Sequence, residues 1–413
     1  MIRIVVVDDS MFMRGAIAKT LTATGNFEVV GQARDGQEAL KRIHDLQPDV
    51  VSMDFNMPGL SGVDAVQAIM RERPTPIVMF SAHTQKGAKE TFDALAAGAV
   101  DFVTKPAGEV STDLSKVQEE LIRKLTAAAA SRPKVSARAP VVAASMPPAS
   151  KGMAASVPPA SKPASTSVPS VPPAKVAASV PPAKVAAASV PPASKPMPAS
   201  AAPASVTPRP PAIAAPRPSS SGAAVGGGAL PRLCVIAVST GGPVALGHVV
   251  PALPADTRFA IVIVQHMPAY FTAALAERLD ADSALTVQEA KSGDRPRPGL
   301  VLIAPGDKHL EFDDRGAVVL RDGPHVNGCR PAADVTMLSA ARVYGRRTIG
   351  VVLTGMGRDG TAGVLAIRRA EGRTLAQDEE TSVIFGMPRS AIESGAIEEI
   401  SPLGEIASRL RYL

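Results

Sequence analysis

One short stretch indicates how the C-terminal half of the chain folds: Leu233-Cys-Val-Ile-Ala-Val-Ser-Thr-Gly-Gly-Pro243. Its first six residues are apolar, which is typical of a buried strand over Leu233–Val238. A serine and a pair of glycines follow, and Pro243 favours the first turn of a helix. We therefore expect Ser239 at a sharp turn between a strand and a helix, beside backbone N–H groups.

The alternation of strand-like and helical patterns continues beyond this stretch. Further strand-like runs are Phe259–Val264, Val301–Ala304 and Ile349–Leu353, and Leu310–Leu320 is typical of an antiparallel hairpin that turns at Asp314-Arg-Gly316. Strands that alternate with helices indicate a parallel sheet. The sequence predicts a Rossmann-like α/β domain over residues 231–413.

The N-terminal part of the chain shows the same alternation. Its strand-like runs are Ile2–Val7, Phe27–Val30, Val50–Met53, Ile77–Phe80 and Val100–Val103. Amphipathic stretches at helical spacing separate them, as in residues 36–46. The sequence predicts a doubly wound (βα)5 domain over residues 1–125.

A stretch of very different composition joins the two α/β regions. Residues 131–230 consist mainly of Ala, Pro, Ser, Val and Lys in near-repeats, so they lack the large apolar side chains of a core. We predict a disordered, partly polyproline-II linker over residues 126–230. It is interpreted as a spacer, with a docking site for an acidic partner as the alternative.

The charge of this linker bears on the choice of partners. Residues 131–230 hold ten Lys or Arg and no Asp or Glu, whereas the whole chain of 413 residues has a net charge of only +6. The positive charge therefore lies in a tether and not on a folded face, which argues against a nucleic-acid partner.

The cysteine count and the N-terminus bear on location. Two cysteines, Cys234 and Cys329, build neither a disulfide framework nor a zinc cluster, as expected in a reducing compartment. Acidic residues at positions 8 and 9 interrupt what would be the apolar part of a secretory segment, and no apolar run is long enough to span a bilayer. We expect a cytoplasmic protein that is not inserted in a membrane.

Polar residues follow the predicted strands of the N-terminal domain. Asp8 and Asp9 follow the first strand, Asp54 the third, Ser81 the fourth and Lys105 the fifth. Ligands of parallel sheets gather at this carboxyl edge, and converging carboxylates favour a hard divalent cation such as Mg²⁺. One carboxylate, which we expect to be Asp54, is then placed to attack a phosphoryl group. Each aspartate taken singly has helix or turn capping as its alternative role.

These residues occur in motifs that are similar to those of a known family. Asp8-Asp9, Asp54 with Met57-Pro-Gly59, Ser81-Ala82 and Lys105-Pro106 resemble the receiver domain of two-component response regulators. The resemblance implies that a histidine kinase phosphorylates Asp54.

The same resemblance implies a role for each residue of the pocket. Mg²⁺ is held by Asp9, Asp54 and the Asn56 carbonyl, with Asp8 behind a water, and Ser81 contacts the phosphoryl group. Lys105 neutralises charge on the transferring oxygens. Phe102 matches the aromatic switch position of such domains, with core packing as the alternative role.

A second group of chemistry-bearing residues lies in the C-terminal domain. Ser239 follows one strand, His266 follows the next, and Asp359 lies in a glycine-rich loop after a third. A serine beside a histidine that a carboxylate orients is the arrangement of a hydrolytic triad. Taken alone, Ser239 could equally cradle a phosphate or cap a helix, His266 could be structural, and Asp359 could cap the helix that begins near Thr361.

The motifs around the three residues favour the hydrolytic triad over these separate roles. Ser239-Thr-Gly-Gly, Gln265-His-Met-Pro and Thr354-Gly-Met-Gly-x-Asp-Gly resemble the catalytic domain of the chemotaxis protein-glutamate methylesterases. The resemblance implies a Ser239 nucleophile, a His266 general base, an orienting Asp359 and an oxyanion-hole donor at the Met356 N–H.

The same family implies a substrate and a form of control. Its members remove methyl groups from glutamate methyl esters of chemoreceptors without a cofactor for that step, deamidate glutamine as a second activity, and are inhibited by their unphosphorylated receiver. The alternative from another class is a non-catalytic signalling adaptor. Two departures from the family stand out: Pro331-Ala-Ala-Asp334 lacks a hydroxyl common at this position, and the linker is longer than usual.

Overall fold

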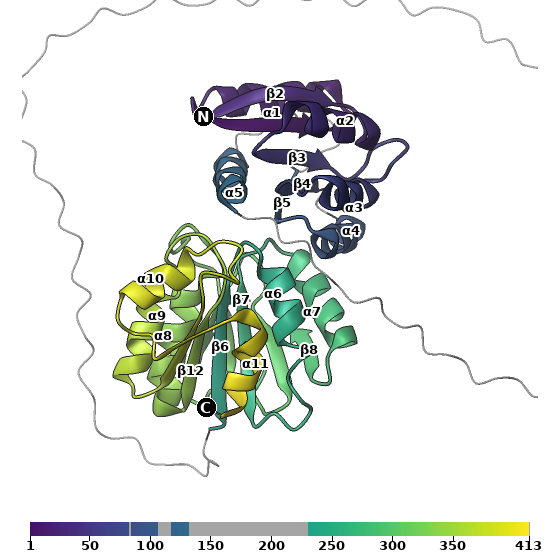
Figure 1. The fold of residues 1–413 in the computed structure, drawn as a ribbon. Coiled ribbons are helices and arrows are strands. Elements are labelled where there is room, and N and C mark those ends of the chain that lie inside the picture. The colour runs from purple at the N-terminus through teal and green to yellow at the C-terminus, as the bar shows by residue number, and fades with distance from the viewer. Residues whose placement is uncertain (82–83, 106–116, 132–229, 413) are drawn as a thin grey trace, which may run out of the picture. The chain divides into compact units, whose positions relative to one another are not determined.

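The N-terminal module is a five-stranded parallel sheet covered by helices on both faces. The structure, a computed structural model, describes residues 1–81, 84–105, 117–131 and 230–412 (Figure 1). The elements of this module are β1 (Ile2–Val7), α1 (Met11–Thr22), β2 (Phe27–Ala33), α2 (Gly36–Leu46), β3 (Val50–Asp54), α3 (Gly62–Glu72), β4 (Ile77–Ser81), α4 (Gln85–Ala97), β5 (Asp101–Thr104) and α5 (Gln118–Ala130). The strand order β2-β1-β3-β4-β5 is doubly wound, so the predicted (βα)5 fold is confirmed.

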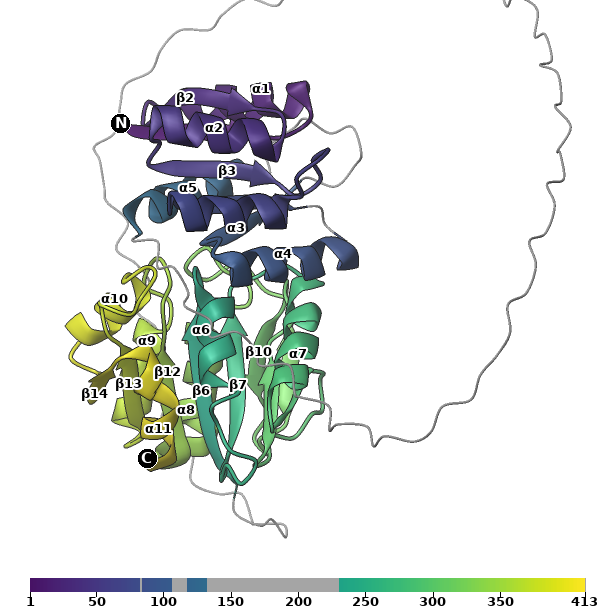
Figure 2. The same ribbon diagram turned by 45° about the vertical axis from the view of Figure 1, so that its right-hand side comes forward.

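Alternation along the interior strand β1 explains how both faces of this sheet are buried. Ile4 and Val6 of β1 belong to one apolar cluster with α1 and α5, whereas Val5 and Val7 belong to another with α2 and α3. Figure 2 shows these helices on either side of the sheet. Helix α5 continues to Ala130, beyond residue 125, and most of the predicted linker (132–229) lies outside the described residues.

The C-terminal module is built on a seven-stranded parallel sheet. Its elements are β6 (Arg232–Val238), α6 (Gly242–Val249), β7 (Phe259–Gln265), α7 (Phe271–Asp282), β8 (Thr286–Glu289), β9 (Leu300–Ile303), β10 (His309–Phe312), β11 (Val318–Arg321), α8 (Ala333–Tyr344), the 3₁₀ turn η1 (Gly345–Arg347), β12 (Thr348–Val352), α9 (Thr361–Arg369), β13 (Arg373–Gln377), α10 (Met387–Glu393), β14 (Glu399–Ser401) and α11 (Leu403–Tyr412). The strand order is β14-β13-β12-β6-β7-β9-β8, and the antiparallel pair β10-β11 is the predicted hairpin.

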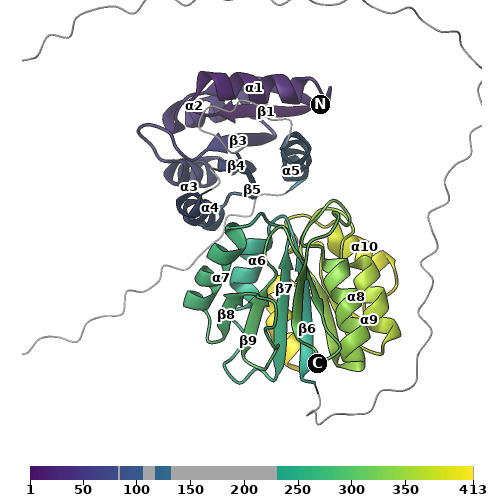
Figure 3. The same cartoon turned by 180° about the vertical axis from the view of Figure 1, so that it is seen from behind.

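Strand β6 lies at the centre of this sheet and is buried on both faces. Leu233, Val235 and Ala237 pack in one apolar cluster with α8, α9 and α10. Cys234 and Ile236 point the other way, into the cluster that contains α6, α7 and α11. Figure 3 shows α8 and α9 on one side of the sheet and α6 and α7 on the other. The predicted α/β fold of this module is confirmed.

Candidate functional sites in the two modules

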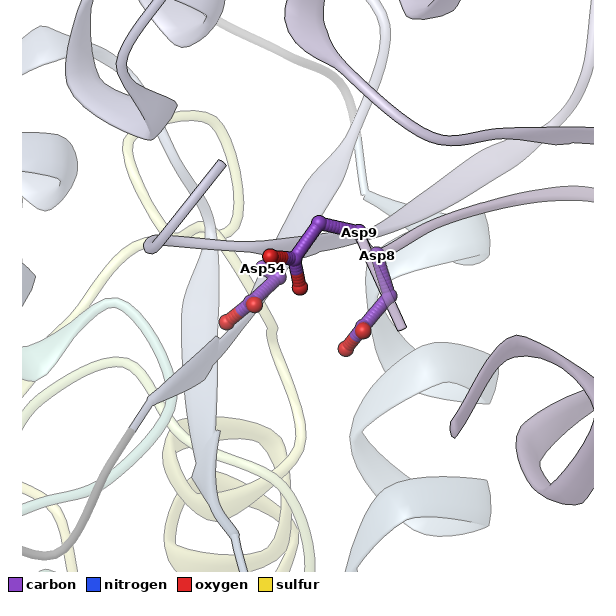
Figure 4. Close-up of side chains that lie close together, drawn as sticks. All are labelled: Asp8, Asp9 and Asp54. Carbon is purple, nitrogen blue, oxygen red and sulfur yellow. The ribbon is translucent and has the colours of Figure 1, made fainter. Parts of the chain in front are cut away.

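The carboxyl edge of the N-terminal sheet carries a cluster of three aspartates. Asp8 and Asp9 follow β1 and Asp54 ends β3, which pairs directly with β1. One carboxylate oxygen of each lies within 4.8 Å of the others (Figure 4). Asp8 and Asp54 are buried and Asp9 is exposed, so the cluster opens to solvent on one side. Oxygen ligands at this spacing suit Mg²⁺.

Lys105 forms the fourth side of this cluster. Its Nζ lies 2.9 Å from Asp54 Oδ2 and 3.1 Å from Asp8 Oδ2. Burial raises the pKa of Asp54 to about 6; Lys105 opposes that rise, and the neighbouring charge of Asp8 adds to it. Burial disfavours the charge of Lys105, but the two carboxylates outweigh it and raise the lysine pKa. One lysine is therefore shared by two buried carboxylates, with the exposed Asp9 beside them.

The remaining predicted residues of this pocket lie on the adjoining elements. Asn56 is exposed in the loop directly after Asp54. Ser81 ends β4, is buried, and its Oγ accepts a hydrogen bond of 2.8 Å from the hydroxyl of Thr91 on α4. Phe102 is buried in β5, and the ammonium of Lys124 lies 4.8 Å from its ring centroid. The sequence did not indicate Thr91 or Lys124, because both lie on amphipathic helices without a motif.

Two neighbouring strands of the C-terminal sheet present Ser239 and His266 at one edge. Ser239 directly follows β6 and His266 directly follows β7, and these strands pair in parallel. The His266 N–H donates to the Val238 carbonyl at 3.1 Å, and the Ser239 N–H donates to the Thr354 carbonyl at 3.0 Å. Both residues are therefore fixed by backbone hydrogen bonds at the carboxyl edge of the sheet.

The turn after Ser239 depends on glycine. Gly241 has φ +78°, which favours a residue without a side chain, and the Gly242 N–H donates to the Ser239 carbonyl at 2.8 Å. Gly355, in the loop after β12, packs so closely that an added Cβ would lie 2.8 Å from the Cβ of Ser239. The backbone of the Gly355-Met356-Gly357 loop can therefore approach the serine.

His266 and Asp359 form a buried hydrogen-bonded pair. The His266 Nε2 lies 2.7 Å from Asp359 Oδ2, and the two side chains are 8% and 2% exposed. Burial disfavours the imidazolium, but the hydrogen bond with Asp359, together with the influence of Cys329, outweighs it and raises the pKa of His266 to about 9. The other ring nitrogen, Nδ1, is buried and has no hydrogen-bond partner among the described residues, so it is available to accept a proton from a hydroxyl.

Asp359 receives more hydrogen bonds than the imidazole alone provides. The N–H groups of Ala333 and Asp334, in the first turn of α8, donate to its two oxygens at 2.6 and 3.0 Å. The amide of Asn327 donates to Oδ1 at 3.0 Å. Burial works against ionisation, but His266 and these N–H groups outweigh it and lower the pKa of Asp359. The donors from α8 are backbone N–H groups, so this set does not depend on the hydroxyl that the 331–334 segment lacks.

The chain matches two family models, one for each module. The CheB methylesterase model matches residues 234–410, and the response regulator receiver domain model matches residues 4–113. Among the described residues, no helix is long and apolar enough to cross a membrane.

Relatives resemble the chain over almost its full length. A protein-glutamate methylesterase/protein-glutamine glutaminase of Symbiobacterium thermophilum is 40% identical over 99% of this chain and 96% of its own length. Proteins of the same name from Pyrococcus abyssi and Alkalilimnicola ehrlichii are 37% and 39% identical, over 98% and 100% of this chain and 91% and 99% of their own lengths. The chain therefore belongs to the family of protein-glutamate methylesterase/protein-glutamine glutaminases, with a response regulator receiver domain ahead of its CheB methylesterase domain.

Proposed function

We propose that the C-terminal module hydrolyses methyl esters of protein glutamates with Ser239 as nucleophile, His266 as general base and Asp359 as orienting carboxylate. The observation that carries this proposal is the unpartnered, buried His266 Nδ1, whose opposite nitrogen is held by Asp359. With Nε2–H donated to a carboxylate, the lone pair of the neutral imidazole is on Nδ1.

The chemical steps follow from this tautomer. Nδ1 takes the proton of the Ser239 hydroxyl as its oxygen attacks the ester carbonyl, and the imidazolium then returns that proton to the departing methanol. Water repeats the sequence to release the glutamate. The Met356 N–H makes no hydrogen bond to another described residue, and its loop lies against Ser239, which supports its role as an oxyanion donor. This chemistry uses no cofactor.

The same apparatus can attack a glutamine side chain, with ammonia as the leaving group. Both activities stand in the names of the relatives. The substrates that we propose are methyl-accepting chemoreceptors, and the place of action is the cytoplasm.

The N-terminal module is proposed as the switch of this esterase, phosphorylated on Asp54 by a chemotaxis histidine kinase. We propose that Asp9, Asp54 and the Asn56 carbonyl hold Mg²⁺, with Asp8 behind a water. The ion would neutralise charge on the phosphoryl oxygens. The Lys105 Nζ lies 2.9 Å from Asp54 Oδ2, and Ser81 lies at the end of the neighbouring strand, which supports their proposed contacts with a phosphoryl group on Asp54. Phe102 is the proposed aromatic switch.

Methanol release from a methylated receptor tests both halves of the proposal. We expect Ser239→Ala to abolish release with and without acetyl phosphate, and Asp54→Asn to retain basal release while losing the response to acetyl phosphate. Undiminished release by Ser239→Ala would refute the assigned nucleophile. A full response of Asp54→Asn would refute the assigned phosphoacceptor.

A further inference from the structure

Two helices of the C-terminal module exchange aspartates at their N-termini. Asp359, which precedes α9, accepts the N–H groups of Ala333 and Asp334 at the start of α8. Asp334, within the first turn of α8, accepts the N–H of Gly363 in the first turn of α9 at 2.8 Å. The two carboxylates thus lie close together, each beside the positive end of the other's helix.

A single side-chain amide bridges these two carboxylates. The Asn327 Nδ2 donates to Asp334 Oδ2 at 2.8 Å and to Asp359 Oδ1 at 3.0 Å. Burial and the charge of Asp359 raise the pKa of Asp334, whereas the pKa of Asp359 is lowered. An NH₂ group offers two protons without a charge, so it can satisfy both oxygens without competing with His266 for Asp359.

The backbone that presents this amide is a tight turn in the left-handed region. Val326 and Cys329 exchange backbone hydrogen bonds of 3.0 and 2.9 Å, and between them Asn327 has φ +52° and Gly328 has φ +75°. Asparagine tolerates that region better than most residues. The turn places the amide on the two aspartates.

We propose that Asn327 is a positioning residue for the reaction: its amide fixes Asp359 in the orientation that holds His266 for proton transfer from Ser239. This inference rests on the proposed triad and deepens it. Among the described residues, the Asn327 amide donates to the two aspartates and to neither the serine nor the imidazole, so its effect on His266 passes through Asp359.

The test is the pH dependence of hydrolysis of a γ-glutamyl methyl ester peptide by the full chain in the presence of acetyl phosphate. Asn327→Gly removes the amide but keeps a residue suited to positive φ. We expect kcat to fall about 10- to 100-fold with KM little changed, as when other groups that orient a catalytic residue are lost. The rising limb of the pH profile should also move to lower pH, because a displaced Asp359 no longer supports the imidazolium.

A matched control separates this effect from a general effect of adding glycine. Glu371 also has a positive φ, +61°, and lies in the loop between α9 and β13, so Glu371→Gly introduces the same type of change away from the site. It should leave kcat and the pH profile unchanged. A wild-type kcat in Asn327→Gly, or a lower kcat with an unmoved pH profile, would overturn the proposal.

Two further comparisons keep the test decisive. If Asn327→Gly does not fold, Asn327→Asp is compared with the double variant Asn327→Asp/Asp334→Asn. The double variant again has one amide beside two carboxylates, so the proposal requires it to be more active than Asn327→Asp. A double variant that is no more active overturns the proposal. Ser239→Ala separates the two hypotheses. Activity in Ser239→Ala would defeat the triad itself, whereas an inactive Ser239→Ala beside a normal Asn327→Gly would defeat only the role of Asn327.

Discussion

The chain contains two buried aspartates at corresponding places, Asp54 in the N-terminal module and Asp359 in the C-terminal module. Their surroundings shift the pKa values of the two carboxyl groups in opposite directions. Each is 2% exposed and lies at the carboxyl edge of a parallel sheet. Asp54 has a pKa of about 6, whereas the pKa of Asp359 is lowered.

The difference lies in the donors that surround each carboxylate. Asp54 accepts one backbone N–H, from Phe55, and shares Lys105 with Asp8. Asp359 accepts two N–H groups of α8, the Asn327 amide and the imidazole of His266. A carboxylate whose charge is incompletely satisfied suits a nucleophile that binds a cation and a phosphoryl group. One whose charge is fully satisfied suits a fixed orienting group.

The largest expected effect comes from removing the charge of the fixed carboxylate. Asp359→Asn should lower kcat for ester hydrolysis by about 10⁴-fold, because the amide cannot hold the imidazole in the required tautomer. Asp54→Asn, the same change in the other module, should leave basal hydrolysis unchanged. Steady-state methanol release by the two full-length variants checks this, and equal losses in both would break the comparison.

The pH dependence of the esterase should follow the imidazole. His266 must be neutral to accept a proton, and its pKa is raised to about 9. We expect kcat/KM to rise about tenfold per pH unit below that value, and so by up to about 100-fold between pH 7 and 9. A profile that is flat over this range would contradict the assigned base.

Cys329 offers a finer test of the same base. Cys329 contributes to the raised pKa of His266, so Cys329→Ala should move the rising limb of the profile to lower pH. Cys234→Ala, at a buried cysteine in β6, is the matched control and should leave the limb in place. If the rising limb does not move in Cys329→Ala, the thiol does not contribute to the raised pKa of His266.

The incompletely satisfied carboxylate should also affect stability. Because the folded-state pKa of Asp54 is raised from 3.8 to about 6, its favourable contribution is present below pH 3.8 and is lost as the pH rises through about 6. Asp54→Asn should therefore raise the unfolding free energy at pH 7.5 by on the order of 2 kcal/mol, and by much less at pH 4. Denaturant unfolding of the full chain at both pH values, in Mg²⁺-free buffer, measures this.

Mg²⁺ should make the wild-type chain more stable than Asp54→Asn, the reverse of the order expected without the ion. At about 100 times its Kd the ion adds about 2.7 kcal/mol to the wild-type chain, whereas Asp54→Asn should gain less because one ligand is lost. Denaturant unfolding at pH 7.5 over a series of Mg²⁺ concentrations, without Ca²⁺, measures the gain in unfolding free energy for each of the two chains. An equal gain in both chains would place the ion elsewhere.

The smallest expected effect concerns the coupling of the two modules through the linker. With about 100 residues, the local concentration of the receiver is about sixfold lower than with about 30, which corresponds to roughly 1 kcal/mol. Shortening the linker should lower basal ester hydrolysis of the unphosphorylated chain. An unchanged or higher basal rate would count against inhibition that depends on tethering.

Much of the fold could be predicted from hydrophobic patterns, and the exceptions have a physical reason. Buried central strands such as β1 and β6 are continuous apolar runs, and their bounds were predicted to within one residue. The hydrophobic patterns do not predict β8, β13 and β14. Strands β8 and β14 are the edges of the sheet: β8, Thr286–Glu289, has a single buried apolar residue among polar ones, and β14, Glu399–Ser401, has only three residues. Strand β13, Arg373–Gln377, begins and ends with polar residues.

The candidate sites also contain residues that the sequence could predict and supporting contacts that it could not. Residues at the ends of strands, such as Ser239 and His266, could be found because the topology of a parallel sheet brings them to one edge. The supporting contacts could not, because Asn327 meets Asp334 and Asp359 through loops whose paths depend on tertiary packing. The dipeptide Asn327-Gly328 is typical of a tight turn, but nothing in the sequence shows which groups that turn faces.

The most direct test of the opposite pKa shifts of the two aspartates is a carboxyl ¹³C NMR titration of the full chain. The chain is labelled at aspartate and titrated in Mg²⁺-free buffer. Asp54→Asn and Asp359→Asn assign the two signals. We predict that the Asp54 signal titrates near pH 6, whereas the Asp359 signal titrates below pH 3.8, the usual pKa of an aspartate. An Asp359 signal that titrates at or above the pH of Asp54 would contradict the account.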